Sequence, residues 1–188
     1  MDFNEVIGQK EAISRLKELA DTKRVPHAMM LCGPQGCGKM AIAIAFASYI
    51  LTHDIDDELR LRQANVMLSN YEHPDLHFSY PVIRPAGTSS EHKMISDDFS
   101  KEWREMLKKD AYFTMDHWLA AMNAANQQAL IGAGESDDLI HKLSRLGHSQ
   151  HRSEGKNPDQ KIGLIFLSVP QMNAVMLLVQ SDGLFLQV

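Results

Sequence analysis

The chain has 188 residues, of which 44% are hydrophobic, and this length can bury the core of one compact domain. Its formal net charge of -5 argues against a free-standing nucleic-acid-binding domain, because such domains usually carry a basic stripe that neutralises phosphates. The longest nearly uncharged apolar run, residues 41–51, is well short of the roughly 20 residues that span a bilayer. Residues 1–6 show no signal-peptide pattern, so we expect a soluble cytoplasmic protein without a membrane segment.

Periodicity in the first part of the chain predicts helices and strands in alternation. Residues 9–23 place apolar side chains at helical spacing, with charged side chains on the other face. Residues 27–32 are apolar and bounded by proline and glycine, which is typical of a strand buried on both faces. Residues 39–52 are apolar nearly all round and predict a helix covered on several sides, whereas residues 56–70 predict a more exposed helix. Residues 76–80 form a second short strand candidate.

The middle of the chain is predicted to be a polar loop followed by helices. Residues 82–97 are rich in proline, glycine and serine and show no periodicity. Helical patterns follow at residues 98–109, 115–122 and 136–146, the last with an acidic start. Trp103 and Trp118 lie in these patterns, and packing is the favoured role for both side chains.

The last part of the chain contains the clearest buried strand. A polar linker over residues 147–160 precedes an apolar run at 161–167, and a short helix is expected at 171–180. A final apolar run covers residues 183–188. Because parallel neighbours need crossover connections, strands separated by helices predict an α/β fold with a parallel sheet and helices on both faces.

The stretch between the first predicted strand and the next predicted helix has the pattern of a phosphate-binding loop. Glycines allow successive backbone N–H groups to point toward an anion, Lys39 adds a positive charge, and the helix start adds its partial positive end. We therefore expect an anion-binding concavity. The candidate nucleotide-binding residues are Gly33, Pro34, Gln35, Gly36, Cys37, Gly38, Lys39 and Met40.

The last position of this loop is unsuited to magnesium. A serine or threonine hydroxyl normally stands there, and the thioether of Met40 is a soft ligand that cannot replace oxygen around a small hard cation. Residues 161–170 carry no carboxylate; Asp159 precedes this strand and Asp182 lies beyond the next element. We therefore predict no catalytic residues, no metal ligands and no hydrolysis, and leave open whether nucleotide binds.

Cysteine and histidine usage indicates neither disulfides nor a metal site. Cys32 and Cys37 are too few for a disulfide framework and are interpreted as small buried apolar residues in a reducing compartment. The 9 histidines are scattered, and the closest pair, His148 and His151, lies in a polar stretch typical of a solvated loop.

Three motifs in this order resemble the clamp-loader branch of the AAA+ proteins: VIGQ at 6–9, RVPHAMMLCGPQGCGK at 24–39 and HPDL at 73–76. Within that branch the chain is most similar to the delta-prime subunits of bacterial DNA polymerase III. The resemblance implies a P-loop NTPase-like fold and a non-hydrolysing subunit that helps load the sliding clamp during DNA replication. Its implied partners are gamma/tau-like and delta-like AAA+ subunits, with only indirect contact with primer-template DNA. No cofactor is required, although weak binding of ATP, ADP or phosphate fits the loop.

Several departures from the family pattern carry expectations of their own. Residues 52–72 contain no cysteine, so we expect no zinc. The lid and collar domains and the family's Ser-Arg-Cys segment are missing, so the chain resembles an incomplete AAA+ domain over residues 1–188. The family fold inserts a strand between the phosphate-loop strand and the strand at 161–167, and we expect residues 184–188 to supply it. Two alternatives stay open: an active gamma/tau-like ATPase, and an unstable chain without a function.

Overall fold

The computed structural model describes residues 1–85, 87–89, 91–125, 127–146, 163–169 and 174–180. The helices are α1 (Lys10–Asp21), α2 (Lys39–His53), α3 (Glu58–Ser69), the 3-10 helix η1 (Ser96–Phe99), α4 (Ser100–Lys109), α5 (Met115–Ala121) and α6 (Ala133–Leu146). The strands are β1 (Ala28–Cys32), β2 (Leu76–Ser79), β3 (Gly163–Val169) and β4 (Ala174–Gln180). No helix in the described ranges is long and apolar enough to cross a membrane.

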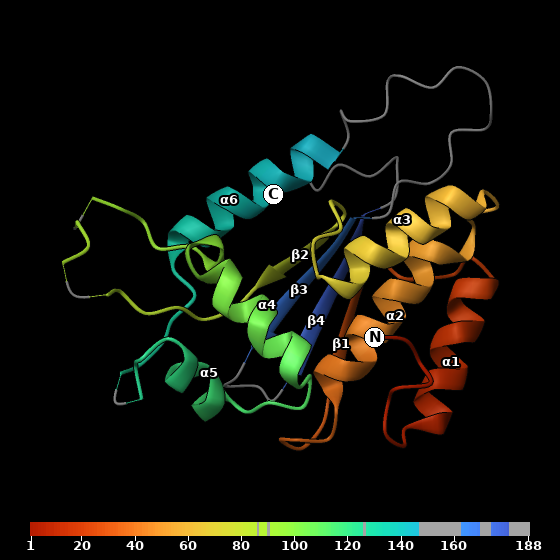
Figure 1. Cartoon of the computed structure of the whole chain (residues 1–188), viewed down its shortest axis with the longest axis horizontal. Helices are drawn as coiled ribbons and strands as arrows, with labels where there is room; N and C mark the ends of the chain where they lie inside the picture. The colour runs from red at the N-terminus through yellow and green to blue at the C-terminus, as the bar shows by residue number, and fades with distance from the viewer. Residues whose placement is uncertain (86, 90, 126, 147–162, 170–173, 181–188) are drawn as a thin grey trace.

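The strands form one mixed sheet in the order β1-β4-β3-β2 (Figure 1). β2 and β3 are parallel, with Phe78 opposite Phe166. β4 is antiparallel to both of its neighbours, and Met176 lies opposite Met30 on one side and Leu167 on the other. The expected parallel sheet is therefore wrong for two of the three strand pairs.

The segment predicted as a helix at residues 171–180 is the strand β4. Only residues 170–173 separate it from β3, and a connection this short cannot carry the crossover that a parallel strand needs. The chain therefore returns as an antiparallel strand. Residues 181–188, which we expected to supply the inserted strand, lie outside the described residues, and so does the linker expected at 147–160. The place between β1 and β3 is taken by β4.

β1 is an edge strand with one uncovered face, so the expectation that it is buried on both faces is wrong. Met29 and Leu31 are partly buried and pack against the core, whereas Ala28, Met30 and Cys32 are exposed. The alternation follows from the period of two along a strand and from cover on one face only.

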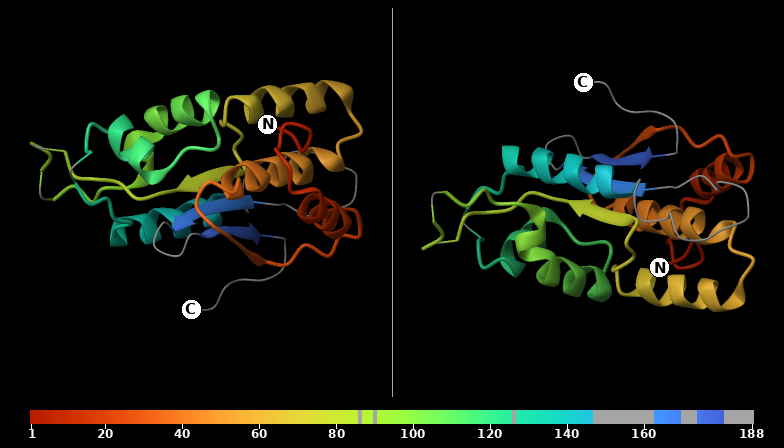
Figure 2. Two further views of the ribbon diagram at one scale, coloured as in Figure 1. Left: turned by 90° about the horizontal axis from the view of Figure 1, so that it is seen from below. Right: turned by 90° about the horizontal axis from the view of Figure 1, so that it is seen from above.

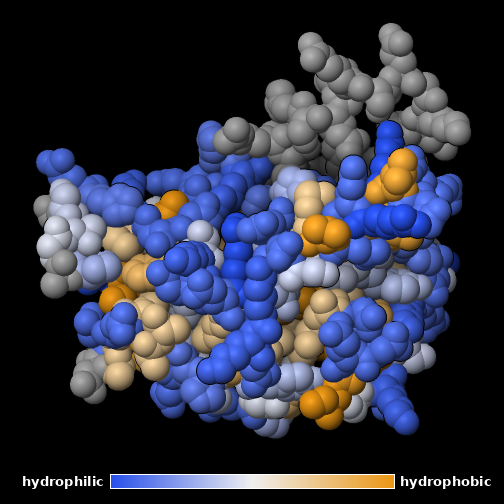
Figure 3. Space-filling model, viewed as in Figure 1, coloured by the Kyte–Doolittle hydropathy of each residue, from blue (hydrophilic) through white to orange (hydrophobic). Residues whose placement is uncertain are grey.

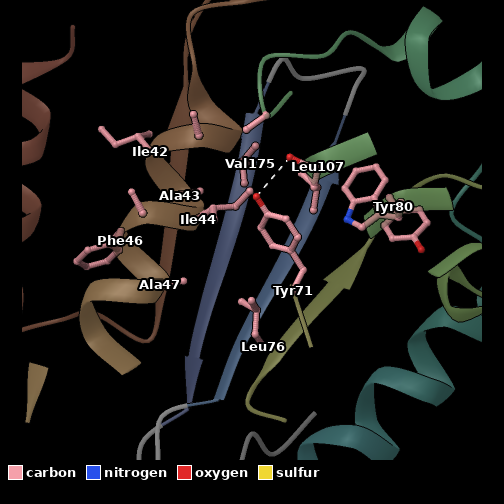
Figure 4. Close-up of a cluster of buried hydrophobic side chains, with 14 of the residues drawn as sticks. Ile42, Ala43, Ile44, Phe46, Ala47, Tyr71, Leu76, Tyr80, Leu107 and Val175 are labelled. Atoms are coloured by element: carbon pink, nitrogen blue, oxygen red, sulfur yellow. Dashed lines mark hydrogen bonds between the residues drawn. The ribbon is translucent and has the colours of Figure 1, made fainter. Parts of the chain in front are cut away.

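α2 is the central helix of the core, as its all-round apolar sequence predicts. Ala41, Ala43, Phe46 and Ala47 are completely buried. The helix packs against β1 and β4, with α1 and α3 as its helical neighbours. Figure 4 shows its side chains near Val175 of β4. The hydroxyl of Tyr71 lies close by and donates a hydrogen bond to the carbonyl of Leu107.

An aromatic cluster holds α4 and α5 against the end of β2. The ring of Tyr80 stacks on Trp103 at 3.9 Å between centroids, and Trp118 meets both rings edge-on at 5.0 Å. The Trp118 indole N–H donates to the carbonyl of Pro81 at 2.7 Å. Both tryptophans are buried, so the packing role predicted for them is confirmed. α6 lies on the opposite side of β2 from α4 (Figure 2).

Candidate functional site

The predicted phosphate-binding residues form one loop between the end of β1 and the start of α2. β1 ends at Cys32 and α2 begins at Lys39, so the buried helix and the half-buried strand hold the two ends of the loop. Gly36 and Gly38 have φ angles of 78° and 86°, which residues with a Cβ resist. The strand, loop and helix thus follow one another as the motif requires.

Lys39 is turned back onto its own loop. Its Nζ donates hydrogen bonds to the carbonyl oxygens of Gly33 at 2.8 Å and Pro34 at 2.6 Å, and lies 3.7 Å from the Sγ of Cys37. The same sulfur fills the space beside Gly33, where an added Cβ would come within 2.8 Å of it. In this conformation the positive charge satisfies loop carbonyls instead of facing outward toward an anion.

The N-terminal segment is joined to the loop from the other side. The side-chain amide of Gln9 donates to the carbonyl of Cys37 at 3.0 Å. The backbone N–H of Ile7 donates to the hydroxyl of Tyr112 at 2.7 Å, although the two residues are 105 positions apart. The ring of Tyr112 occupies the space beside Gly38, since a Cβ at that glycine would lie 2.8 Å from its Cε1. Three separate segments therefore meet at the start of α2.

Tyr112 is the residue of this site that sequence reasoning missed. It stands in the connection between α4 and α5, where its own backbone N–H donates to Oδ1 of Asp110 at 2.7 Å. No motif marks this position, and its contact with the loop depends on how α4 packs. The side chain is only partly buried, so burial patterns would not have singled it out.

The described residues do not fit a magnesium site at this loop. Met40 is partly buried, packs against the core and offers no oxygen. The residues of β3, Gly163–Val169, include no carboxylate, and Asp159 and Asp182 lie outside the described residues. Among the described residues, no group of three or more histidine, cysteine or acidic side chains could hold a metal ion.

The two cysteines are less buried than predicted. Cys32 is exposed, because it stands on the uncovered face of the edge strand β1, and Cys37 is partly exposed in the loop. Both are free thiols. The interpretation of both residues as buried apolar side chains is therefore wrong.

A buried polar network joins the end of β2 to η1 and α6. The hydroxyl of Ser96 accepts from the N–H of Tyr80 at 2.9 Å and donates to its carbonyl at 3.0 Å. The Tyr80 hydroxyl donates to the carbonyl of Ser96 at 2.7 Å, and the N–H of Ser96 donates to Oε2 of Glu135 at 2.7 Å. Burial and nearby carboxylates raise the pKa of Tyr80, so it stays a neutral donor. The network joins Tyr80, and with it the aromatic cluster, to η1 and α6.

A charged cluster lies close to this network. Lys142 of α6 contacts Asp97 at 2.8 Å and Asp138 at 2.6 Å. Burial lowers the pKa of His77, and the charge of Lys142 lowers it further, against the opposing effect of nearby carboxylates. These contacts tie α6 to η1, and sequence reasoning did not find them.

The strand, phosphate loop and helix, with the buried central helix α2, define a P-loop NTPase-like domain. The model of the family described as DNA polymerase III, delta subunit, matches residues 8–127, and the chain belongs to this family. It is a clamp-loader family of DNA replication.

Short stretches are also similar to archaeal clamp-loader proteins. The replication factor C small subunit of Methanosarcina acetivorans is 44% identical over 53 residues, which are 28% of this chain and 15% of that protein. The small subunit of Archaeoglobus fulgidus is 50% identical over 45 residues, or 24% of this chain and 14% of the relative. The matches thus span only a small part of these relatives. No solved structure matches the chain.

Proposed function

We propose that this chain is a non-hydrolysing, delta-prime-like clamp-loader subunit of DNA polymerase III that acts in the cytoplasm. It serves as a structural partner for ATP-hydrolysing subunits of the gamma/tau type and for delta-like subunits. The observation that carries the proposal is the loop itself, in which Met40 supplies no oxygen and Lys39 is bound to the carbonyls of Gly33 and Pro34.

The chemistry of the loop supports binding without turnover. Hydrolysis in P-loop enzymes uses a magnesium ion held partly by the hydroxyl that follows the loop lysine. A thioether cannot take that place around a hard cation. Backbone N–H groups of the glycine-rich loop and the Lys39 ammonium can receive phosphate groups weakly once the lysine turns outward.

Exposed apolar side chains on α3 support a role in assembly, and the net charge does not favour direct DNA binding. Figure 3 shows a mainly hydrophilic face on which apolar side chains form small separate groups. Leu59 and Val66 of α3 are 70% and 62% exposed and stand one heptad apart on the same side of the helix. With a net charge of -5, contact with primer-template DNA is expected through partner subunits.

The competing proposal is an active gamma/tau-like ATPase. The observation in its favour is that the three glycines and Lys39 of the phosphate loop are all present. It requires magnesium ligands from residues other than Met40 and the residues of β3.

Release of phosphate from Mg-ATP separates the two proposals. We expect the wild-type chain and a Lys39→Ala variant, each purified alone, to release phosphate at the same background rate. Met40→Thr should also stay at background, because it restores one oxygen ligand and no carboxylate. Wild-type turnover above that of Lys39→Ala would favour the ATPase. Failure to co-purify with co-expressed clamp-loader subunits would count against the assembly role.

A further inference from the structure

The ring of Tyr112 lies against the phosphate loop at Gly38 and is here called the cover of the loop. Gly38 is the residue before the first turn of α2, and the Tyr112 hydroxyl accepts the N–H of Ile7. In a loop of this type, an anion is held by backbone N–H groups and by the partial positive charge at this helix end. An uncharged aromatic ring at this place therefore competes with any phosphate chain for space.

Tyr112 is also hydrogen-bonded to the N-terminal segment. Ile7 is bound to Tyr112 and Gln9 is bound to the carbonyl of Cys37, so residues 7–9 are attached to the loop and to its cover at once. If the ring moves away from Gly38, the N–H of Ile7 loses its partner. Displacement of the cover thus weakens the attachment of the N-terminal segment.

We propose that Tyr112 is a positioning residue that sets the affinity of the loop for polyphosphate and couples its occupancy to loss of the hydrogen bond between the Ile7 N–H and the Tyr112 hydroxyl. The inference rests on the proposed function, because it concerns the same loop. Binding requires two movements. Lys39 turns from the carbonyls of Gly33 and Pro34 toward the ligand, and the Tyr112 ring leaves Gly38. The affinity measured is then the intrinsic affinity reduced by the fraction of molecules in which the cover is open.

Two variants separate the ring from its hydroxyl. Tyr112→Ala removes both, and Tyr112→Phe keeps the ring against Gly38 while freeing the N–H of Ile7. The matched control is Tyr49→Phe, which removes another tyrosine hydroxyl bonded at 2.6 Å, here to Oδ1 of Asp21 and away from the loop. Thermal unfolding of each variant checks that the fold is retained.

Titration calorimetry with tripolyphosphate and with ADP measures the effect. We expect Tyr112→Ala to bind tripolyphosphate about tenfold or more tightly than the wild type, if the cover is open in about a tenth of the molecules or fewer. Tyr112→Phe should be intermediate and Tyr49→Phe unchanged. In hydrogen exchange, saturating tripolyphosphate should speed the exchange of the Ile7 amide in the wild type. That exchange should already be fast in Tyr112→Phe without ligand.

Equal affinity in the wild type and Tyr112→Ala would overturn the proposal, and so would a lack of measurable binding by both. Weaker binding by Tyr112→Ala would also overturn it, because the ring would then contact the ligand and not compete with it. If Tyr112→Ala does not fold, the exchange of the Ile7 amide in the wild type and in Tyr112→Phe still decides. Mg-ATP turnover by the wild type would refute the proposed function without touching these outcomes.

Discussion

Two buried serines give a paired prediction with opposite results for the same chemical change. Ser96 and Ser79 are 0% and 1% exposed, one in η1 and the other in β2. The Ser96 hydroxyl is bonded to both backbone groups of Tyr80, whereas the Ser79 hydroxyl has no hydrogen-bond partner in the described part of the chain. Replacing each serine by alanine removes one hydroxyl and changes almost nothing else.

The contacts set the size of each effect. Ser96→Ala leaves the N–H and the carbonyl of Tyr80 buried without this hydrogen-bond partner. Each such group costs roughly 1–3 kcal/mol, so we expect about 3 kcal/mol of destabilisation. Ser79→Ala removes a hydroxyl that was buried without compensation, and we expect a change within about 0.5 kcal/mol or a gain of up to about 1 kcal/mol.

Urea unfolding followed by tryptophan fluorescence measures both values, since Trp103 and Trp118 lie in the cluster next to the network. With a slope near 2 kcal/mol per molar urea, Ser96→Ala should lower the midpoint by about 1.5 M and leave the slope unchanged. Equal destabilisation by the two variants would refute the reasoning, because it would mean that loss of packing dominates and not loss of hydrogen bonds.

Two further predictions concern a histidine and a helix cap. The pKa of His77 is lowered in the folded state by burial first and by Lys142 second, so below pH 6.5, the ordinary histidine pKa, the unfolded chain binds more protons. Stability should therefore fall as the pH drops through 6.5 toward the folded pKa of His77. Urea midpoints measured across this pH range should fall less steeply in His77→Gln than in the wild type. Asp57 caps α3 by accepting the N–H groups of Leu59 at 2.8 Å and Arg60 at 3.2 Å, so Asp57→Ala should cost about 1 kcal/mol in thermal or urea unfolding. Asp56→Ala removes the same charge one residue earlier, and an equal loss there would show that charge matters and not the cap.

The sequence predicts well those elements whose patterns are long and local. α2 is buried because every side of it is apolar, and the phosphate loop lies where the glycines and Lys39 place it between a strand and a helix. The limits of α1 and α3 differ from the expected ranges by one or two residues. Such elements depend on neighbours within a few positions, and the sequence displays those neighbours directly.

Prediction fails where the outcome depends on a partner far along the chain. Residues 171–180 are rich in methionine, leucine and valine, which suit a buried helix or a buried strand, and pairing with β1 and β3 decides for a strand. α6 begins at Ala133 and not at 136, and Glu135 in its first turn accepts the N–H of Ser96. That carboxylate is 4% exposed, so a distant hydrogen bond determines where it lies.

The phosphate loop has a structural use that does not depend on a nucleotide. At Gly38 the φ of 86° and the ring of Tyr112 both exclude a Cβ. Alanine there would strain the backbone and displace the ring. Lys39 donates hydrogen bonds to the carbonyls of Gly33 and Pro34, and Gln9 donates to the carbonyl of Cys37. A loop that has lost the oxygen ligand for magnesium can therefore still require its glycines and its lysine, because they join the N-terminal segment, α2 and the connection between α4 and α5. The presence of these residues is for this reason weak evidence for ATP hydrolysis. The thioether of Met40, which offers no oxygen to magnesium, is stronger evidence against hydrolysis.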